Sequence, residues 1–140
     1  VTGESVLDVG CGTGLLLDYA RPARYMGVDP SGAMLDRLLA KHPERRGDVV
    51  NAPLRSFVGD RVDVVVSLFG SASYLMDDEL RRVPTLVRPG GRWLLMFYSE
   101  GYEPVTHAKT GVFPPTRTYA GLPEGRVSAF CDYTVVEGPG

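Results

Sequence analysis

The 140-residue chain has few of the features that mark secreted, zinc-binding or membrane proteins. Its two cysteines, Cys11 and Cys131, are too few for a disulfide framework and have no zinc-ligand spacing. No apolar run approaches the roughly 18 residues of a membrane-spanning helix, and no signal peptide precedes the first apolar segment. We therefore expect a protein of the reducing cytoplasm with no metal site and no contact with a membrane.

A surplus of charge of either sign is also missing. The chain carries 15 Lys and Arg against 17 Asp and Glu, a net charge of −2. Proteins that bind nucleic acid usually present a basic face, so nucleic acid is not an expected partner. The pairs Arg45-Arg46 and Arg81-Arg82 are interpreted as solvated helix ends. With 44% hydrophobic residues, the chain is expected to form one domain over residues 1–140.

The most informative segment is residues 6–14, which read VLDVGCGTG. An apolar strand ends there in three glycines at alternate positions, and Leu15-Leu16-Leu17 then starts a helix. Glycine reaches positive φ angles and lets a ligand approach the backbone, because no Cβ stands in the way. The free N–H groups at a helix start can face that ligand. The segment predicts a nucleotide-sized cradle.

The glycine spacing narrows the choice of ligand. A dinucleotide-binding turn has the pattern G-x-G-x-x-G, and Leu15 occupies the place of its last glycine. The Gly-Lys-Ser/Thr ending of a phosphate-binding loop is missing too. No Lys or Arg lies between Val1 and Ala20, so a pyrophosphate would find no cation nearby. The turn favours a ligand whose middle is uncharged or cationic.

This combination resembles the first motif of the class I S-adenosylmethionine-dependent methyltransferases, where a strand with an acidic residue near its end meets G-x-G-x-G. The resemblance implies S-adenosylmethionine as the cofactor, with S-adenosylhomocysteine as its product. It implies that the acidic residue orders the turn and reaches the amino group of the ligand. The cofactor-binding residues that it places in this motif are Asp8, Gly10, Cys11, Gly12 and Gly14.

The rest of the chain alternates strands with helices as far as Tyr98, which predicts an α/β fold with a doubly wound, mostly parallel sheet. Ligands of such sheets bind beyond the carboxyl ends of the strands. An antiparallel hairpin is expected at the C-terminal edge. The expected strands are Ser5–Val9, Tyr25–Val28, Asp48–Asn51, Val62–Leu68 and Arg92–Tyr98, with Thr116–Tyr119 and Arg126–Val136 as the closing pair.

Three helices are expected between these strands. The first covers Leu15 to Ala20, the second starts at the N-cap Ser31 and ends before Pro43, and the third covers Asp77 to Arg88. Pro84 lies inside the third and predicts a kink. Residues 88–91, RPGG, predict a turn before the next strand.

Asp29 ends the second expected strand, 19 residues after Gly10. An acidic residue there points into the same crevice as the glycine turn. A carboxylate can accept hydrogen bonds from both hydroxyls of a ribose, and such charge-assisted bonds are stronger than neutral ones. The alternative is a turn aspartate that precedes Pro30 and has no ligand.

Further cofactor contacts follow from the resemblance. Many family members have an aspartate at the position of Asn51 that accepts from the adenine amino group. Asparagine keeps one acceptor oxygen and loses the charge. The other residues placed around the cofactor are Pro30, Met34, Ala52, Ser67 and Leu68.

Residues 64–75, VVVSLFGSASYL, resemble small-molecule amine N-methyltransferases. Methyl transfer is an in-line displacement, so the enzyme mainly aligns two partners and excludes water. An unprotonated amine needs no base, whereas an oxygen nucleophile more often does. Tyr74 and His107 are the candidate catalytic residues. The motifs of DNA-amino, cytosine-carbon and metal-dependent catechol methyltransferases are missing.

Family members usually begin with helices that cover the cofactor, whereas the first strand here starts at Ser5. We therefore expect a pocket that is either open or covered by the loop of residues 101–115, by a second copy of the chain or by another protein. We also expect weak cofactor affinity in the isolated monomer. Two alternatives remain open. One is a cofactor-binding subunit without catalysis, and the other is a nucleotide-dependent oxidoreductase.

Overall fold

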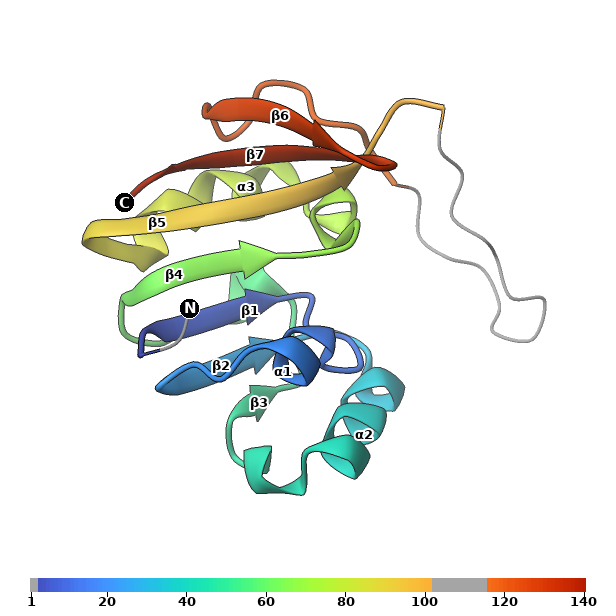
Figure 1. Cartoon of the computed structure of the whole chain (residues 1–140), viewed down its shortest axis with the longest axis vertical. Coiled ribbons are helices and arrows are strands. Elements are labelled where there is room, and N and C mark those ends of the chain that lie inside the picture. Colours follow the sequence, from blue (N-terminus) through green and yellow to red (C-terminus); the bar gives the residue numbers. More distant parts are fainter. Residues whose placement is uncertain (1–2, 102–115) are drawn as a thin grey trace.

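A computed structural model describes residues 3–101 and 116–140. They form one seven-stranded sheet with the strand order β3-β2-β1-β4-β5-β7-β6 (Figure 1). Strands β1 to β5 pair in parallel, and β7 pairs antiparallel with both β5 and β6. The strands are β1 Ser5–Val9, β2 Arg24–Val28, β3 Val49–Val50, β4 Val62–Ser67, β5 Val87–Tyr98, β6 Arg126–Phe130 and β7 Tyr133–Pro139.

The predicted doubly wound α/β fold with an antiparallel edge is confirmed. Three α-helices and four 3-10 helices connect the strands, and no helix of the described ranges is long and apolar enough to cross a membrane. The α-helices are α1 Leu15–Tyr19, α2 Gly32–Lys41 and α3 Asp77–Arg82. The 3-10 helices are η1 Pro43–Arg45, η2 Leu54–Ser56, η3 Ser71–Tyr74 and η4 Val83–Leu86.

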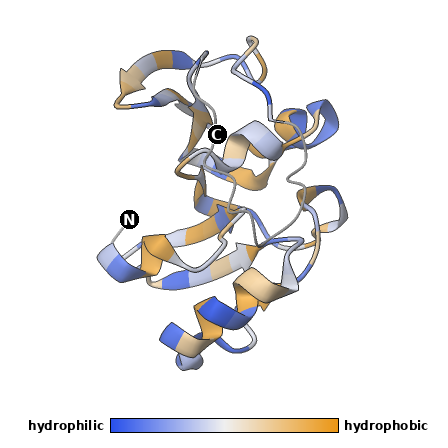
Figure 2. Cartoon of the chain, turned by 90° about the vertical axis from the view of Figure 1, so that its right-hand side faces the viewer, coloured by the Kyte–Doolittle hydropathy of each residue, from blue (hydrophilic) through white to orange (hydrophobic). Residues whose placement is uncertain are grey.

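The order in which successive strands are added across the sheet reverses between β1 and β4, which are parallel neighbours. Strand β2 follows β1 on one side and β4 lies on the other side. In a doubly wound sheet this switch point opens a crevice at the carboxyl ends of the two strands. Figure 2 looks toward this end of the sheet.

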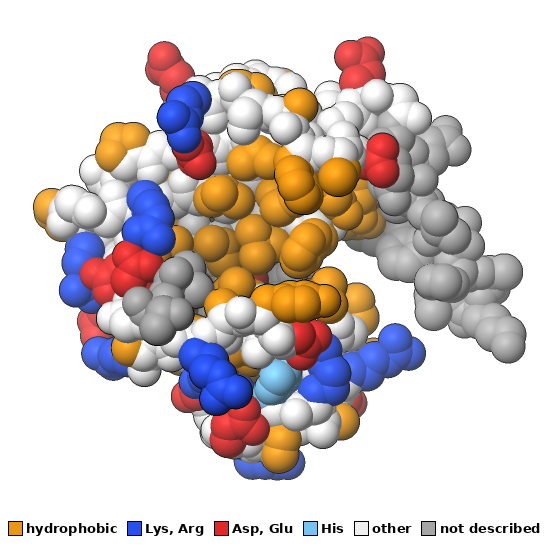
Figure 3. All heavy atoms as spheres, viewed as in Figure 1, with side chains coloured by type: hydrophobic (Ala, Val, Ile, Leu, Met, Phe, Trp, Pro, Cys, Tyr) orange, Lys and Arg blue, Asp and Glu red, His pale blue; other side chains and the backbone are white. Residues whose placement is uncertain are grey.

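The two faces of the sheet are covered differently. Leu7, Val65 and Leu95 point to one face and pack with the apolar residues of α3 and η4 in the largest core cluster. On the opposite face Val6, Val64 and Val66 form a smaller cluster with Leu16 of α1. We call the stretch of this second face over β4, β5 and β7 the open face, because no described helix passes in front of it in Figure 1. Figure 3 shows that apolar side chains gather there.

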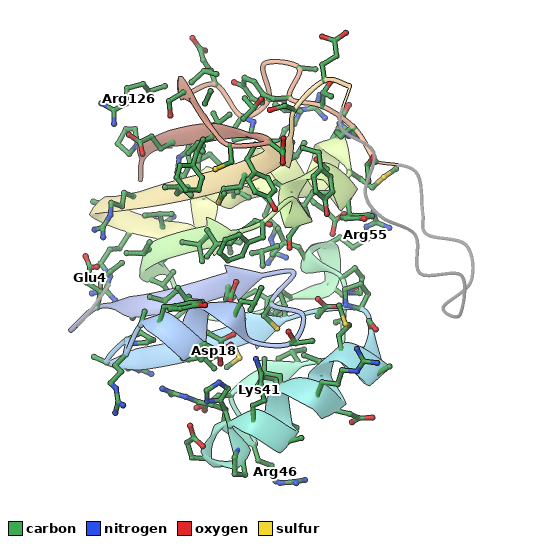
Figure 4. All side chains as sticks on the ribbon, turned by 45° about the vertical axis from the view of Figure 1, so that its right-hand side comes forward. Glu4, Asp18, Lys41, Arg46, Arg55 and Arg126 are labelled. Carbon is green, nitrogen blue, oxygen red and sulfur yellow. The ribbon has the colours of Figure 1, made fainter. Side chains whose placement is uncertain are left out.

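Helices α1 and α2 are tied together at their C-terminal ends. The carboxylate of Asp18 in α1 accepts a hydrogen bond from Lys41 Nζ and lies beside His42 Nε2, at 2.8 Å in each case (Figure 4). The apolar side of α2 packs under Cys11 through the buried Leu35 and Leu38. The end of the glycine turn is thereby fixed against α2.

The helix expected over residues 77–88 is shorter in the structure. Helix α3 ends at Arg82, and η4 continues from Val83 with Pro84 in its first turn. Proline has no N–H for the next helical hydrogen bond and is accommodated at a helix start, so the predicted kink appears as this junction.

The expected turn at residues 88–91 lies within β5, where the pairing with β4 shifts register between Val62 and Val64. A side chain at Gly91 would collide with the carbonyl oxygen of Asp63. Glycine therefore allows this close approach of the two strands.

The C-terminal hairpin also differs from the prediction. Its two strands are β6 and β7, so the expected strand over Arg126–Val136 is broken by a turn at Cys131, whose φ is 51°. Thr116–Tyr119 forms no strand. The Tyr119 ring instead packs on Phe97, with ring centroids 5.4 Å apart. The edge is antiparallel as expected, but a different segment supplies it.

Leu95→Ala tests which face carries the main core. Leu95 is fully buried, and removing such a side chain costs about 2–5 kcal/mol of unfolding free energy. Leu94 is the neighbouring, half-buried residue on the open face, so Leu94→Ala is the matched control and is expected to cost less than half as much. Urea denaturation of both variants measures the difference, and equal losses would contradict this assignment of the faces.

Candidate functional site

The glycine turn connects β1 to α1 and is held by backbone hydrogen bonds. Gly10 N and Cys11 N both donate to Val28 O, at 2.8 and 3.2 Å, and Gly14 N donates to Cys11 O at 2.9 Å. The φ angles of Gly10, Gly12 and Gly14 are 68°, 53° and 82°. Three left-handed positions in five residues explain the alternate glycines, since other residues rarely adopt this conformation.

The three glycines have different surroundings. A Cβ at Gly12 would point into the space between the turn and Met34, with Met34 Cε 3.7 Å away as its nearest neighbour. A Cβ at Gly14 would lie 2.9 Å from Leu38 Cγ, and one at Gly10 would lie 2.8 Å from Ser71 Cβ. Gly14 thus packs the turn on α2, whereas a Cβ at Gly12 would only reach van der Waals contact, so the backbone there is less crowded. This uncrowded backbone fits the close approach that the expected cofactor needs.

Asp29 connects the turn to the start of α2. Its Oδ2 accepts from Gly12 N at 2.9 Å, and its Oδ1 accepts from Ser31 N at 2.8 Å. The residue is 9% exposed. Each carboxylate oxygen has two lone-pair sites, so one on each oxygen remains for a further donor. The structure therefore keeps capacity for two ligand hydroxyls beside the glycine turn.

Asn51 and Ala52 follow β3 and lie next to Asp29. Ala52 N donates to Asp29 O at 3.1 Å. The Asn51 amide nitrogen, oriented to satisfy its neighbours, donates to Asp29 O at 3.2 Å and to Pro30 O at 3.1 Å. The amide oxygen of Asn51 is then directed away from these two carbonyls. The adenine contact of that oxygen stays a prediction.

Asp8 is buried in the sheet, on the face that carries α1. Its Oδ2 accepts a hydrogen bond of 2.9 Å from Tyr25 OH, and burial raises the pKa of its carboxyl group to about 7. Burial likewise raises the pKa values of Tyr25 and of the Cys11 thiol. Gly27 makes room for this group, because a Cβ there would lie 2.8 Å from both Cys11 Sγ and Tyr25 OH. The hydrogen-bond donor to Asp8 is thus the hydroxyl group of Tyr25, which was not predicted from the sequence.

The loop after β4 is attached to the glycine turn. Ser71 Oγ donates to Gly10 O at 3.0 Å, and Ser73 Oγ accepts from Tyr98 N at 2.8 Å. Tyr74 ends η3 half-buried, with its ring 6.3 Å from that of Tyr98 in an edge arrangement. The structure thus brings Tyr74 to the same end of the sheet as the glycine turn. His107 lies outside the described residues.

The remaining predicted residues differ in position and in exposure. Pro30 is exposed after β2, and Met34 on α2 is 39% exposed beside Gly12. Ser67 is fully buried at the end of β4, and among the described residues its hydroxyl has no hydrogen-bond partner. Leu68 packs with the small cluster on the α1 face. The Ser67 side chain is therefore closed off from a ligand, and only its backbone is left for the predicted contact.

The contacts of Tyr25 and Ser71 were not among the predictions from the sequence. The contact between Tyr25 and Asp8 could have been found from the strand pattern. Tyr25 pairs with Val6, and Val6 lies on the same face of β1 as Asp8 because side chains alternate along a strand, so Tyr25 shares that face. Nothing in the sequence marks Ser71, whose partner lies 61 positions away. No three His, Cys, Asp or Glu side chains gather as a metal site in residues 3–101 and 116–140.

A family model described as "Methyltransferase domain" matches residues 7–93, which contain the glycine turn, Asp29, Asn51 and the loop with Ser71. The match covers more than half of the chain. A solved relative, the sugar N-methyltransferase KedS8 from a Streptoalloteichus species, has a TM-score of 0.57 and 26% identity over 75% of this chain and 45% of its own.

Two curated proteins are similar in sequence. One is the dTDP-4-amino-2,3,4,6-tetradeoxy-D-glucose N,N-dimethyltransferase of Saccharopolyspora spinosa, 32% identical over 98% of this chain and 60% of its own. The other is the probable S-adenosylmethionine-dependent methyltransferase CRG1 of Saccharomyces cerevisiae, 32% identical over 69% of this chain and 36% of its own. The chain spans less than two thirds of either relative. It belongs to the family of class I S-adenosylmethionine-dependent methyltransferases.

Proposed function

We propose that the protein transfers the methyl group of S-adenosylmethionine to an amine nitrogen of a small molecule. The observation that carries the proposal is the similarity over 98% of the chain to an enzyme named as an amino-sugar N,N-dimethyltransferase. The similarity to the sugar N-methyltransferase KedS8 supports it. Because the chain belongs to the methyltransferase family, the alternative of a nucleotide-dependent oxidoreductase is excluded.

The residues around the glycine turn fit the cofactor. S-adenosylmethionine supplies an electrophilic methyl group on a sulfonium when it is bound. Asp29 would accept hydrogen bonds from the ribose hydroxyls, and Asn51 would accept one from the adenine amino group. Asp8 would attract the cationic amino group of the methionine part. The bare backbone at Gly12 lets the ligand approach closely. The remaining contacts would come from Gly10, Cys11, Gly14, Pro30, Met34, Ala52, Ser67 and Leu68.

Tyr74 is proposed to shape the acceptor side of the site. Its loop is bound to Gly10 through Ser71, so Tyr74 keeps a fixed position relative to the cofactor residues. A neutral amine already carries the lone pair that attacks, so alignment and exclusion of water are sufficient. His107 stays a candidate base from the sequence alone. A second copy of the chain or another protein is proposed to cover the pocket.

A methyl-transfer assay tests the proposal. The purified chain is incubated with S-adenosylmethionine and either a set of amino sugars and simple amines or the corresponding alcohols, and S-adenosylhomocysteine and methylated product are quantified. We expect product from amines alone, with one S-adenosylhomocysteine per methyl group. Methylation of alcohols alone would overturn the choice of nitrogen. Cofactor binding without turnover on any acceptor would favour the non-catalytic subunit.

Asp29→Ala tests the ribose contact. Removing hydrogen bonds to a charged group costs about 1.5–3 kcal/mol, so the dissociation constant for S-adenosylhomocysteine should rise about 10- to 150-fold. Calorimetric titration measures it. Asp36→Ala on the exposed side of α2 is the control, with unchanged affinity expected. Asp29→Asn shows how much of the loss depends on charge. Unchanged affinity in Asp29→Ala would place the ribose elsewhere.

The raised pKa of Asp8 predicts a pH-dependent affinity. A cationic ligand group favours the ionised carboxylate, and burial holds the pKa of Asp8 at about 7 in the free protein. Binding should therefore release a proton below pH 7, and affinity for S-adenosylhomocysteine should rise from pH 5.5 to 7.5 by at most about tenfold per pH unit. Titrations in two buffers of different ionisation enthalpy detect that proton.

Asp8→Asn serves as the matched variant for this pH dependence. Asparagine can still accept from Tyr25 OH but cannot ionise. Its affinity should change little over the same pH range. The idea fails if the wild-type chain and the variant show the same slope.

A further inference from the structure

Four aromatic rings meet at the carboxyl ends of β4 and β5. Tyr98 stacks on Tyr133 with ring centroids 5.9 Å apart and an interplanar angle of 28°. Phe69 meets Tyr133 edge-on at 6.3 Å, and Tyr74 meets Tyr98 edge-on at 6.3 Å. We call these four residues the aromatic cluster. It joins the loop after β4 to the C-terminal hairpin.

The cluster lies directly beside the cofactor residues. The Tyr98 ring packs on the backbone of Gly70, where any Cβ would collide with the ring. The next residue, Ser71, donates its hydroxyl hydrogen bond to Gly10 of the glycine turn. Tyr98 and Tyr133 are paired neighbours of β5 and β7 and continue the open face to the end of the sheet. One short loop therefore separates the rings from the glycine turn.

Phe69 has a conformation and an exposure that core packing does not explain. Its φ is 53°, and a bulky residue with a positive φ is a strained outlier of the backbone. Such strain concentrates at binding and active sites. The side chain is nevertheless 41% exposed. The strained backbone turns an apolar ring to solvent beside Tyr133, although burying it would stabilise the fold.

We propose that the aromatic cluster binds the methyl acceptor and selects an amine that carries alkyl substituents and becomes cationic. Ring faces attract cations through their quadrupole and also offer apolar contact to the attached carbons. The inference rests on the proposed function. It adds the acceptor-contacting residues Phe69, Tyr98 and Tyr133, which come from two parts of the chain distant in sequence.

The reaction supplies the charge that the rings recognise. The lone pair of the amine forms the new N–C bond while the S–C bond breaks and its electron pair stays on sulfur. The positive charge passes from sulfur to nitrogen, and the ammonium product then loses a proton to solvent. Rings beside the nitrogen stabilise the charge as it develops there. They also bind alkylammonium groups, so a stable cation is a suitable probe.

Choline and its uncharged carbon isostere, neohexyl alcohol, test the inference without turnover. Each is titrated into the chain saturated with S-adenosylhomocysteine, and its methyl proton resonance is followed. Methyl groups held over ring faces shift upfield. We expect a saturable upfield shift for choline and at least about threefold weaker binding of the isostere.

The variants assign the effect to the cluster. Phe69→Leu and Tyr133→Leu keep apolar volume and lose a ring, so each should weaken choline binding about threefold or more. Tyr133→Phe keeps the ring and should retain binding. Tyr19→Leu, at a residue of α1 that is 85% exposed, is the matched control for loss of an aromatic ring. S-adenosylhomocysteine affinity should be unchanged in all four, which also shows that each variant folds.

The outcomes separate this inference from the proposed function. Equal binding of choline and neohexyl alcohol, or unchanged choline binding in both leucine variants, would overturn the inference. Amine methylation that proceeds equally well in Phe69→Leu and Tyr133→Leu would overturn it too, and the proposed function would stand. Methylation of alcohols alone would instead refute the proposed function, and choline binding would then still report what the rings attract.

Discussion

The carboxylate of Asp29 is the interaction on which the candidate site depends. One carboxylate oxygen accepts a hydrogen bond from Gly12 N and the other accepts one from Ser31 N. The carboxylate thereby fixes the glycine turn against the start of α2. Gly12 lies in the turn after β1 and Ser31 is the N-cap of α2, where backbone N–H groups have no partner within a helix or strand. The carboxylate supplies a hydrogen-bond acceptor to both. A ligand that uses the remaining lone pairs meets a group that is already oriented. The proposed ribose contact and the local fold therefore depend on the same residue.

A second connection sets the distance between the two halves of the site. Ser71 Oγ bridges from the loop after β4 to Gly10 O, and Gly70 lets the Tyr98 ring lie against the same loop. The strand order places β4 beside β1, so these contacts cross the switch point of the sheet. Movement of the loop would therefore change the proposed acceptor site and the glycine turn together. In-line transfer requires this fixed alignment.

Local chemistry made much of the fold predictable from the sequence. The glycine turn, the Ser31 cap and the strand ends at Asp29 and Asn51 are each defined by neighbouring residues. Contacts between distant segments were not predictable, which is why the Tyr25–Asp8 bond and the Phe69–Tyr133 contact were missed. The broken strand at Cys131 was missed for another reason, since a non-glycine residue adopts the left-handed turn there. The sequence thus predicted the local turns, caps and strand ends better than the contacts between distant segments.

The two sides also differ in how they treat positive charge, and the difference suits an amine acceptor. Carboxylates such as Asp8 and Asp29 attract cations, but a carboxylate beside an amine raises the pKa of that amine and keeps it protonated. A protonated amine has no lone pair to attack a methyl group. Aromatic rings attract the charge that develops during transfer and are far weaker proton acceptors. In the proposed site, rings at the acceptor would raise the pKa of the amine less than a carboxylate would, and they would still stabilise the positive charge that develops during transfer.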